Sequence, residues 1–350
     1  MKRLPSRLHR RPQRRLIAAA LVGSALTLSL VGCSDEGDAF DFNSGFGRDG
    51  AAQQGGVNRT SVAGDGVSRL PMGPRADFEV FRTLDDGTKI AQTTLTGSKS
   101  GVTGKVWVWA PKQYFDPKYA ASGFPVLIAL PGSYGFDSNY WTKPSNRFLD
   151  TVSRMSQEGT SLPFLVVMPV MNPEKRYYDG SDIPGQPKMG TWMTEDVPDF
   201  VRANFRTFNS RDGWAFMGSS SGGFVALKSV LKHPDRFKAA ISSGPDIVPD
   251  SPMWKNHPLQ KLANNPRQLA GDLLKRPKSP EVYLAFQVGS KETLIPRVKR
   301  FMLEYGKGPI KTRLQVVPNG VHNPATYVKG MEAGSLSWIS SHLRAPVAAP

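Results

Sequence analysis

Short apolar runs recur along the chain from residue 75 onward and alternate with longer stretches of mixed polarity. The runs expected to form buried strands are Val126–Leu130, Phe164–Pro169, Trp214–Met217, Ala239–Ser242, Val282–Val288 and Arg313–Val317. The stretches expected to form helices are Arg147–Gln157, Met193–Asn204, Gly222–Lys232, Pro296–Tyr305 and Thr326–His342. Continuous apolar strands separated by helices predict an α/β fold, with a mostly parallel central sheet of about eight strands and helices on both faces.

Two further strands precede this pattern. Lys89–Thr96 and Thr103–Ala110 flank a Gly- and Ser-rich turn, which predicts an antiparallel pair. The stretch Asp246–Pro280 is expected to be irregular. We predict one catalytic domain over residues 75–345, because about 270 residues of this pattern fit one domain.

The N-terminus has the pattern of an export signal. Residues 1–32 contain seven Lys or Arg residues and no acid, and they include the apolar run Leu16–Val31. The next residue is Cys33, the single cysteine of the chain, and Leu30-Val31-Gly32-Cys33 resembles the lipobox of bacterial lipoproteins. That resemblance implies a lipoprotein signal peptide over residues 1–32, and lipidation of Cys33 with anchoring to the outer face of the bacterial cell membrane.

Other interpretations of this region remain open. Cys33 could be a free thiol of a secreted protein, or the apolar run could stay as an uncleaved anchor. The Arg pairs at positions 10–11 and 14–15 do not decide between general secretory and twin-arginine export. Residues 33–74 lack a helical or strand period, which predicts a flexible tether between the membrane and the domain.

Composition narrows the functional classes. The 350 residues carry a net charge of +16, without a Lys/Arg run interleaved with aromatic residues, so we expect no nucleic-acid partner. One cysteine excludes a disulfide within the chain and a Cys-based zinc site. The positive charge fits work near anionic cell-wall polymers or lipid headgroups better than nucleic-acid binding, but ordinary solvated Lys and Arg residues explain it at least as well. We expect a monomer.

The candidate nucleophile is Ser220. It is the central residue of Gly218-Ser219-Ser220-Ser221-Gly222, which matches G-x-S-x-G and has a predicted strand before it and a predicted helix after it. A sharp turn there projects one hydroxyl above the sheet, and small residues two positions away on each side make room for it. A Gly/Ser loop without chemistry is the alternative.

A serine nucleophile needs a base and an orienting acid. Among the five histidines, His322 follows the last predicted strand, and His257 in the irregular stretch is a weaker rival. Glu292 follows the penultimate strand and is the preferred acid, with Asp246 as the alternative. Glu292 could instead serve as a helix N-terminal carboxylate or as a partner of Arg297.

An oxyanion hole requires two backbone donors. One is expected to be the amide of Ser221, the residue after the nucleophile. The other should come from the loop after Val126–Leu130, where Gly132 permits the turn and Ser133 is the preferred donor. Tyr134 is the alternative, since the sequence does not determine the register of this loop. Tyr134 and Trp141 are candidate substrate-pocket residues, together with other aromatic residues nearby.

Residues 101–343 resemble the esterase branch of the α/β-hydrolases that contains esterase D and the mycobacterial mycolyltransferases. The stretches that carry this resemblance are Gly104–Pro111, Phe124–Gly132, Trp192–Val201, the turn at Ser220 and His233–Phe237. The resemblance implies the α/β-hydrolase fold and a triad of Ser220, Glu292 and His322. Ser219 and Ser221 at the variable motif positions, and Pro131 where many relatives have His or Asp, depart from the family pattern.

The implied chemistry is acyl transfer through an acyl-enzyme, with no metal or organic cofactor. The first hypothesis is a membrane-anchored serine esterase that acts on cell-wall or lipid-derived carboxylic esters. The second is a mycolyltransferase-like acyltransferase that moves an acyl group to a sugar hydroxyl. The third is a non-catalytic surface-binding lipoprotein on a hydrolase scaffold. The second hypothesis differs from the first in its acceptor, and the third predicts no reaction with any ester.

Overall fold

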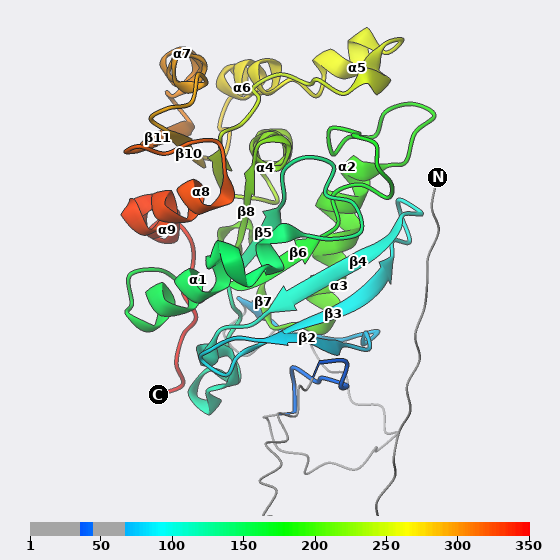
Figure 1. Ribbon diagram of the computed structural model, residues 1–350, viewed down its shortest axis with the longest axis vertical. Coiled ribbons are helices and arrows are strands. Elements are labelled where there is room, and N and C mark those ends of the chain that lie inside the picture. Colours follow the sequence, from blue (N-terminus) through cyan, green and yellow to red (C-terminus); the bar gives the residue numbers. More distant parts are fainter. Residues whose placement is uncertain (1–35, 45–66) are drawn as a thin grey trace, which may run out of the picture. The chain divides into compact units, whose positions relative to one another are not determined.

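The computed structural model describes residues 36–44 and 67–350 (Figure 1). The strands are β1 Ser68–Arg69, β2 Glu79–Thr83, β3 Lys89–Thr96, β4 Thr103–Trp109, β5 Val126–Leu130, β6 Leu165–Pro169, β7 Thr207–Phe208, β8 Trp214–Ser219, β9 Ala239–Ser243, β10 Val282–Gly289 and β11 Ile310–Val317. The α-helices are α1 Phe148–Gln157, α2 Met189–Thr191, α3 Val197–Asn204, α4 Ser221–Lys232, α5 Pro258–Leu262, α6 Pro266–Lys275, α7 Ile295–Tyr305, α8 Pro324–Gly330 and α9 Leu336–Ser340. Short π-helical segments, η5 Trp192–Asp196 and η8 Met331–Ser335, join α2 to α3 and α8 to α9.

The central sheet has nine strands in the order β11-β10-β9-β8-β5-β6-β4-β3-β2. Neighbouring strands are parallel from β11 to β6 and antiparallel from β6 to β2. The predicted antiparallel pair is therefore present as β3 and β4. The sheet is mixed, and it contains β2, which the sequence pattern did not reveal. Strands β1 and β7 form a separate antiparallel pair.

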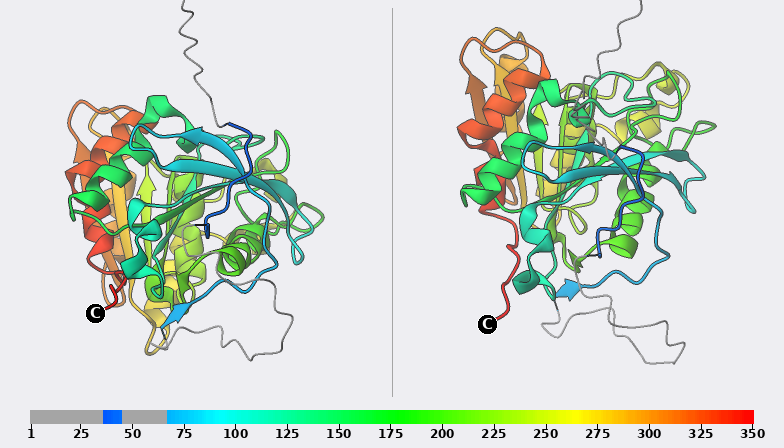
Figure 2. Two further views of the ribbon diagram at one scale, coloured as in Figure 1. Left: turned by 90° about the horizontal axis from the view of Figure 1, so that it is seen from below. Right: turned by 60° about the horizontal axis from the view of Figure 1, so that its bottom comes forward.

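The central strands are buried because helices cover both faces of the sheet. Every residue of β5, β6 and β8 is buried, as expected for strands without a solvent-facing side. Helices α1, α8 and α9 lie together on one face, and α3, α4 and α6 cover the other (Figure 2). This arrangement confirms the predicted α/β architecture.

The strand order places two loops side by side. Strand β5 lies between β6 and β8. From β5 the chain continues to β6 on one side of it, and later returns to add β8 on its other side, so the strand order reverses at β5. Ligands of open α/β sheets bind outside the carboxyl ends of strands at such a switch point. The loop after β5 and the turn after β8 therefore meet at one place, which is where the candidate oxyanion loop and candidate nucleophile lie.

Two helices occupy the stretch that was expected to be irregular. Helices α5 and α6 lie within residues 246–280. Each starts with a proline in its first turn, and the side chain of Asn265 caps α6 by accepting a hydrogen bond from the Arg267 amide. These helices have 5 and 10 residues, which is too few turns for a helical period of apolar residues to stand out in the sequence. The predicted helix Thr326–His342 is instead interrupted in η8, where Gly334 has a φ of 130°.

Part of the predicted tether packs against the domain. The amide of Gly37 donates to the Val80 carbonyl at 2.6 Å, and the amide of Phe40 donates to the Phe78 carbonyl at 2.8 Å, so residues 36–44 line the edge of β2. Phe42 is 1% exposed, and its ring centroid lies 5.2 Å from that of Phe78 and 4.9 Å from that of Phe205. The expectation of a flexible segment is therefore wrong for these residues. It is also wrong for Ser68 and Arg69, which form β1 and pair with β7.

The signal segment, Cys33 and residues 34–35 and 45–66 of the predicted tether lie outside the described residues. Among the residues that are described, every helix is too short or too polar to cross a bilayer.

Candidate active site

Ser220 sits at a sharp turn between β8 and α4, with a φ of 54° and a ψ of −123°. This left-handed backbone is costly for a residue with a side chain, and such strain concentrates at functional sites. Gly218 and Gly222, two residues away on each side, are required because there is no space for a side chain at either position. A β-carbon on Gly218 would lie 2.3 Å from the Gly222 carbonyl oxygen, and one on Gly222 would lie 2.3 Å from the Pro131 carbonyl oxygen. The strand, turn and helix predicted around Ser220 are all present.

His322 and Glu292 meet across the loops that follow β11 and β10. Oε2 of Glu292 lies 2.7 Å from Nδ1 of His322. The glutamate side chain is 4% exposed and the imidazole 46% exposed. Oε1 of Glu292 accepts a hydrogen bond from the Gly289 amide at 2.7 Å, which fixes the carboxylate. The structure thus brings together the preferred base and the preferred acid.

The pair is polarised toward an ionised acid and a basic imidazole. The hydrogen bond to Glu292 raises the pKa of His322, although burial acts in the opposite direction. Burial acts to raise the pKa of Glu292, but the hydrogen bonds from His322 and Gly289 outweigh it, so this pKa lies below its ordinary value. Glu292 is therefore suited to stabilise an imidazolium.

Ser220 and His322 both approach the backbone at Ser243–Gly244. The Ser220 amide donates to the Ser243 carbonyl at 2.8 Å. A β-carbon on Gly244 would lie 2.9 Å from Cε1 of His322. Within the described residues, the Ser220 hydroxyl and the imidazole make no hydrogen bond with each other. Catalytic hydrogen bonds often tighten only in the substrate complex.

Tyr327 is a member of the site that the sequence did not indicate. Its hydroxyl donates to Glu292, at 3.2 Å from Oε1 and 3.1 Å from Oε2, and lies 2.8 Å from Nδ1 of His322. Burial and the charge of Glu292 raise the pKa of this hydroxyl, which therefore stays protonated. No sequence motif marks a tyrosine five residues after the histidine, because its position depends on how α8 packs.

The loop after β5 approaches the nucleophile turn closely. The Gly132 amide donates to the Tyr140 hydroxyl at 2.7 Å, so it is not available to an oxyanion. Ser133 has a φ of 57°, and its carbonyl accepts a hydrogen bond from the Ser221 hydroxyl at 2.7 Å. Over residues 36–44 and 67–350, the amides of Ser133 and Ser221 have no hydrogen-bond acceptor.

A cavity of about 470 Å³ opens beside Ser220. Its lining residues are Ser133, Tyr134, Lys175, Arg176, Tyr177, Ser220, Ser221, Asp246, Asp250, Pro252 and Met253. Tyr134 is 53% exposed, so it is accessible to a ligand as expected. Trp141 is 0% exposed, and its indole N–H donates to the Leu130 carbonyl at 2.8 Å. Trp141 is therefore a core residue, and its assignment to the pocket is wrong.

Within the described part of the chain, two other candidate residues make no hydrogen bond or ion pair with His322 or Glu292. Asp246 forms an ion pair with Arg297 at 3.3 Å, whereas Glu292 contacts His322 directly. His257 precedes α5, and its amide donates to the Trp254 carbonyl at 2.9 Å. Neither residue takes the position that the triad arrangement requires.

The wall of the cavity is held by a buried lysine. Nζ of Lys228, on α4, donates to the carbonyls of Asp179 at 2.6 Å and Gly180 at 2.5 Å. The Asp179 carboxylate in turn accepts hydrogen bonds from the Ser251 amide and the Trp254 indole. Burial lowers the pKa of Lys228 to about 7. These contacts join the two loops that carry Tyr177 and Met253.

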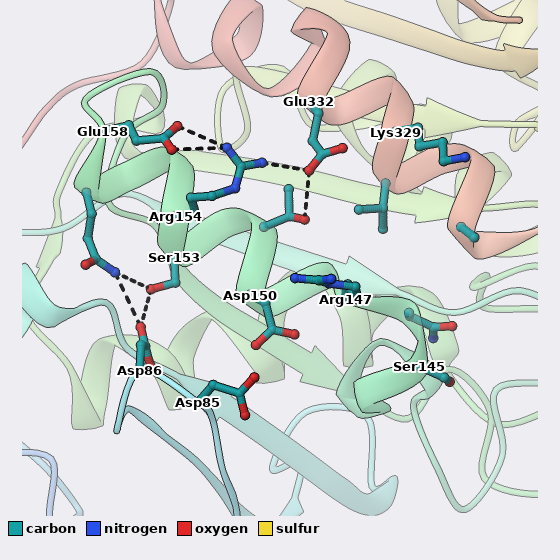
Figure 3. A pocket seen from close by; sticks show the side chains of 15 residues that line it. Asp85, Asp86, Ser145, Arg147, Asp150, Ser153, Arg154, Glu158, Lys329 and Glu332 are labelled. Carbon is teal, nitrogen blue, oxygen red and sulfur yellow. Dashed lines mark hydrogen bonds and ion pairs between the residues drawn. The ribbon is translucent and has the colours of Figure 1, made fainter.

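A larger cavity, of about 710 Å³, lies between α1, α8 and the turn after β2 (Figure 3). Some of its charged side chains pair with one another. Arg154 pairs with Glu158 at 3.0 Å and with Glu332 at 2.7 Å, and Asp86 accepts a hydrogen bond from Ser153. None of Ser220, Glu292 and His322 lines it. We therefore place the active site at the smaller cavity.

Comparison with known proteins agrees with this geometry. A model of the family described as "Putative esterase" matches residues 100–308, more than half of the chain. Esterase Rv1288 of Mycobacterium tuberculosis is 30% identical over 156 residues, which cover 44% of this chain and 31% of that protein. An uncharacterised protein of Corynebacterium glutamicum is 25% identical over 172 residues, covering 46% of this chain and 39% of that protein. The chain thus spans well under half the length of these relatives.

A solved structure shows the fold. The S-formylglutathione hydrolase of Agrobacterium tumefaciens superposes with a TM-score of 0.57 at 19% identity, covering 75% of this chain and 98% of that chain. Together, the nine-stranded sheet and the family match show that the chain has the α/β-hydrolase fold and belongs to this esterase family.

Proposed function

We propose that this protein is a serine hydrolase of carboxylic esters that works through an acyl-enzyme. The observation that carries the proposal is the 2.7 Å contact between Glu292 and His322. Both side chains lie beside Gly244, and the Ser220 amide donates to the carbonyl of the preceding residue, Ser243. A strained serine, a histidine and a nearly buried carboxylate are the groups that nucleophilic acyl transfer requires. Membership of the esterase family supports the same chemistry.

In the first step, Oγ of Ser220 attacks the carbonyl carbon of the ester while His322 accepts the hydroxyl proton. The resulting imidazolium is stabilised by Glu292, which keeps Nδ1 in hydrogen-bonded contact. The negative charge that develops on the carbonyl oxygen is met by the amides of Ser133 and Ser221, which have no other acceptor in the described structure. Collapse of the intermediate releases the alcohol, which takes its proton from His322.

In the second step, water replaces the alcohol. His322 removes a proton from the water as it attacks the acyl carbon, and the same two amides stabilise the second tetrahedral intermediate. Release of the carboxylic acid restores the Ser220 hydroxyl. Each step needs a neutral imidazole at its start, so protonation of His322 before substrate binding stops the reaction.

The cavity indicates the kind of ester. Its volume of about 470 Å³ lies within the range of small-molecule sites. Tyr134, Tyr177 and Met253 provide apolar contacts. The charged lining residues are of both signs, namely Lys175, Arg176, Asp246 and Asp250. These side chains fit an ester with an apolar portion beside a polar or charged group, as in cell-wall or lipid-derived molecules. Lipidation of Cys33 would hold the enzyme beside such substrates on the outer face of the membrane.

The test uses the chain from Asp35 onward, which forms one compact unit. Hydrolysis of p-nitrophenyl esters of increasing acyl length and labelling by a fluorophosphonate probe are measured for the wild type and for Ser220→Ala. Ser98→Ala, at an exposed turn, is the matched control. We expect turnover and labelling in the wild type and the control, and neither in Ser220→Ala. A folded wild type without either activity would leave only the binding-protein hypothesis, and acylation of added trehalose would identify a transferase.

A further inference from the structure

The two serines beside the nucleophile both contact the loop after β5. The Ser221 hydroxyl donates to the Ser133 carbonyl at 2.7 Å. On the other side, the buried Ser219 hydroxyl is hydrogen-bonded to the Tyr140 hydroxyl. The same Tyr140 oxygen accepts the Gly132 amide at 2.7 Å. Each flanking serine is thereby linked to one of two consecutive residues near the start of this loop, Ser219 to Gly132 and Ser221 to Ser133.

The loop needs such support because of its conformation and its position. Ser133 has a φ of 57°, a backbone geometry that side-chain-bearing residues seldom adopt. Ser133 and Tyr134 are exposed, so packing alone does not hold them. At Gly132 the loop comes so near the turn that a β-carbon would lie 3.2 Å from Cβ of Ser220 and 3.2 Å from the Tyr140 hydroxyl. Small shifts of the loop would therefore change the distance between the nucleophile and its oxyanion donors.

Tyr140 is itself fixed from several directions. Its carbonyl accepts a hydrogen bond from the Asn146 amide group at 2.5 Å, and its ring packs on Trp141 with centroids 5.0 Å apart. Burial raises the pKa of its hydroxyl, so the phenol keeps its proton. The Tyr140 oxygen can accept from Gly132 and use its proton in the hydrogen bond with Ser219. The loop is thus connected through Tyr140 to a rigid part of the domain.

We propose that Ser219 and Ser221 are positioning residues of the oxyanion hole, which fasten the loop after β5 to the nucleophile turn at Gly132 and Ser133. The hydrogen bond from the Ser221 hydroxyl fixes the orientation of the Ser133 carbonyl. Tyr140, which is hydrogen-bonded to Ser219, accepts the Gly132 amide and so fixes its position. With both contacts in place, the backbone of Ser133 and Ser221 is held beside Ser220, and their amides remain available to an oxyanion. This inference rests on the proposed esterase function, and it assigns a purpose to the two serines by which the motif departs from the family pattern.

The test separates transition-state stabilisation from folding. The variants are Ser219→Ala, Ser221→Ala and Tyr140→Phe, with Ser221→Thr as the conservative variant that keeps the hydroxyl. The matched control is Ser242→Ala, which removes a buried hydroxyl that donates to the Gly223 carbonyl at 2.8 Å and does not touch the loop. The readouts are kcat and KM on a p-nitrophenyl ester, the inhibition constant of a boronic acid that forms a tetrahedral adduct, and the melting temperature.

Removal of one oxyanion donor lowers kcat by about a hundredfold to a thousandfold, so a donor that is only displaced should cost about tenfold. We expect Ser219→Ala, Ser221→Ala and Tyr140→Phe to lose about tenfold in kcat and in boronic-acid affinity, with KM within about twofold of the wild type. Ser221→Thr should recover most of both losses, and Ser242→Ala should match the wild type in both.

Two results would overturn the proposal. One is that the three variants keep the wild-type kcat and boronic-acid affinity. The other is that they lose activity only in proportion to a fall in melting temperature, with the affinity for the boronic acid unchanged. Failure of the esterase function itself looks different, because then the wild type would not hydrolyse esters at any acyl length.

Discussion

Oε2 of Glu292 lies 2.7 Å from Nδ1 of His322, and the glutamate side chain is almost completely buried. This contact raises the pKa of His322. The imidazole must be neutral to act as a base, so activity should decline as the pH falls through this raised pKa. The acid limb of the pH profile should therefore lie above the value of about 6.5 that an unperturbed imidazole would give.

Glu292→Gln removes the charge that stabilises the imidazolium and keeps the shape of the side chain. We expect kcat to fall by roughly a thousandfold to ten-thousandfold. The pKa of His322 should decrease as well, which moves the acid limb of kcat/KM to lower pH. Steady-state kinetics over roughly pH 5 to 9, a range that includes the titration of histidine, measures both effects. If Asp246→Asn gave the larger loss, Asp246 rather than Glu292 would be the acid.

Tyr327→Phe should shift the same limb in the opposite direction. The Tyr327 hydroxyl donates to both oxygens of Glu292, at 3.2 and 3.1 Å. Without this donor the carboxylate becomes more basic and stabilises the imidazolium more strongly, so the pKa of His322 should rise. We expect the acid limb of kcat/KM to move to higher pH and kcat to fall several-fold. An unchanged pH profile would show that Tyr327 only fills space.

Phe42→Ala tests whether the segment before the domain contributes to its stability. The ring is buried against Phe78 and Phe205, and truncation of a buried phenylalanine costs about 3–5 kcal/mol. Urea unfolding should show a loss of this order, whereas Leu303→Ala, at an exposed position on α7, should be neutral. Equal stability of the two variants would mean that residues 36–44 do not hold their place on β2 in solution.

Cys33→Ser tests the proposed anchor. In cells that express the full chain, the wild type should fractionate with membranes and incorporate labelled fatty acid, because a diacylglycerol on Cys33 supplies two acyl chains, which anchor a protein stably. The variant should incorporate no label. Ester hydrolysis by the two purified proteins should be equal, since Cys33 is far from Ser220, Glu292 and His322 in the sequence and precedes the catalytic domain. Label in the variant would place the acyl groups on another residue.

The sequence pattern predicted secondary structure correctly where the residues of a single segment determine its structure. The five apolar residues of β5 and the strand–glycine–helix pattern at Ser220 predicted the centre of the sheet and the nucleophile turn, because burial on both faces and a tight turn each leave a local signature. His322 followed from its place after the last strand.

Contacts between distant segments left no such signature. Tyr327 reaches Glu292 only because α8 packs beside the loop after β10, and Phe42 is buried only because Phe78 and Phe205 leave room for it. Trp141 looked like a pocket residue from its nearness to the oxyanion loop, but its indole faces the end of β5. In each case the decisive partner is far away in the sequence.

The pairing of residues 36–44 with β2 has a practical consequence for work on this protein. Strand β2 is the last strand on its side of the sheet, and an uncovered edge strand offers its backbone to other chains. A recombinant chain that begins after residue 44 would expose this edge together with the cavity left by Phe42. The expected outcome is aggregation, which could be mistaken for self-association of the enzyme.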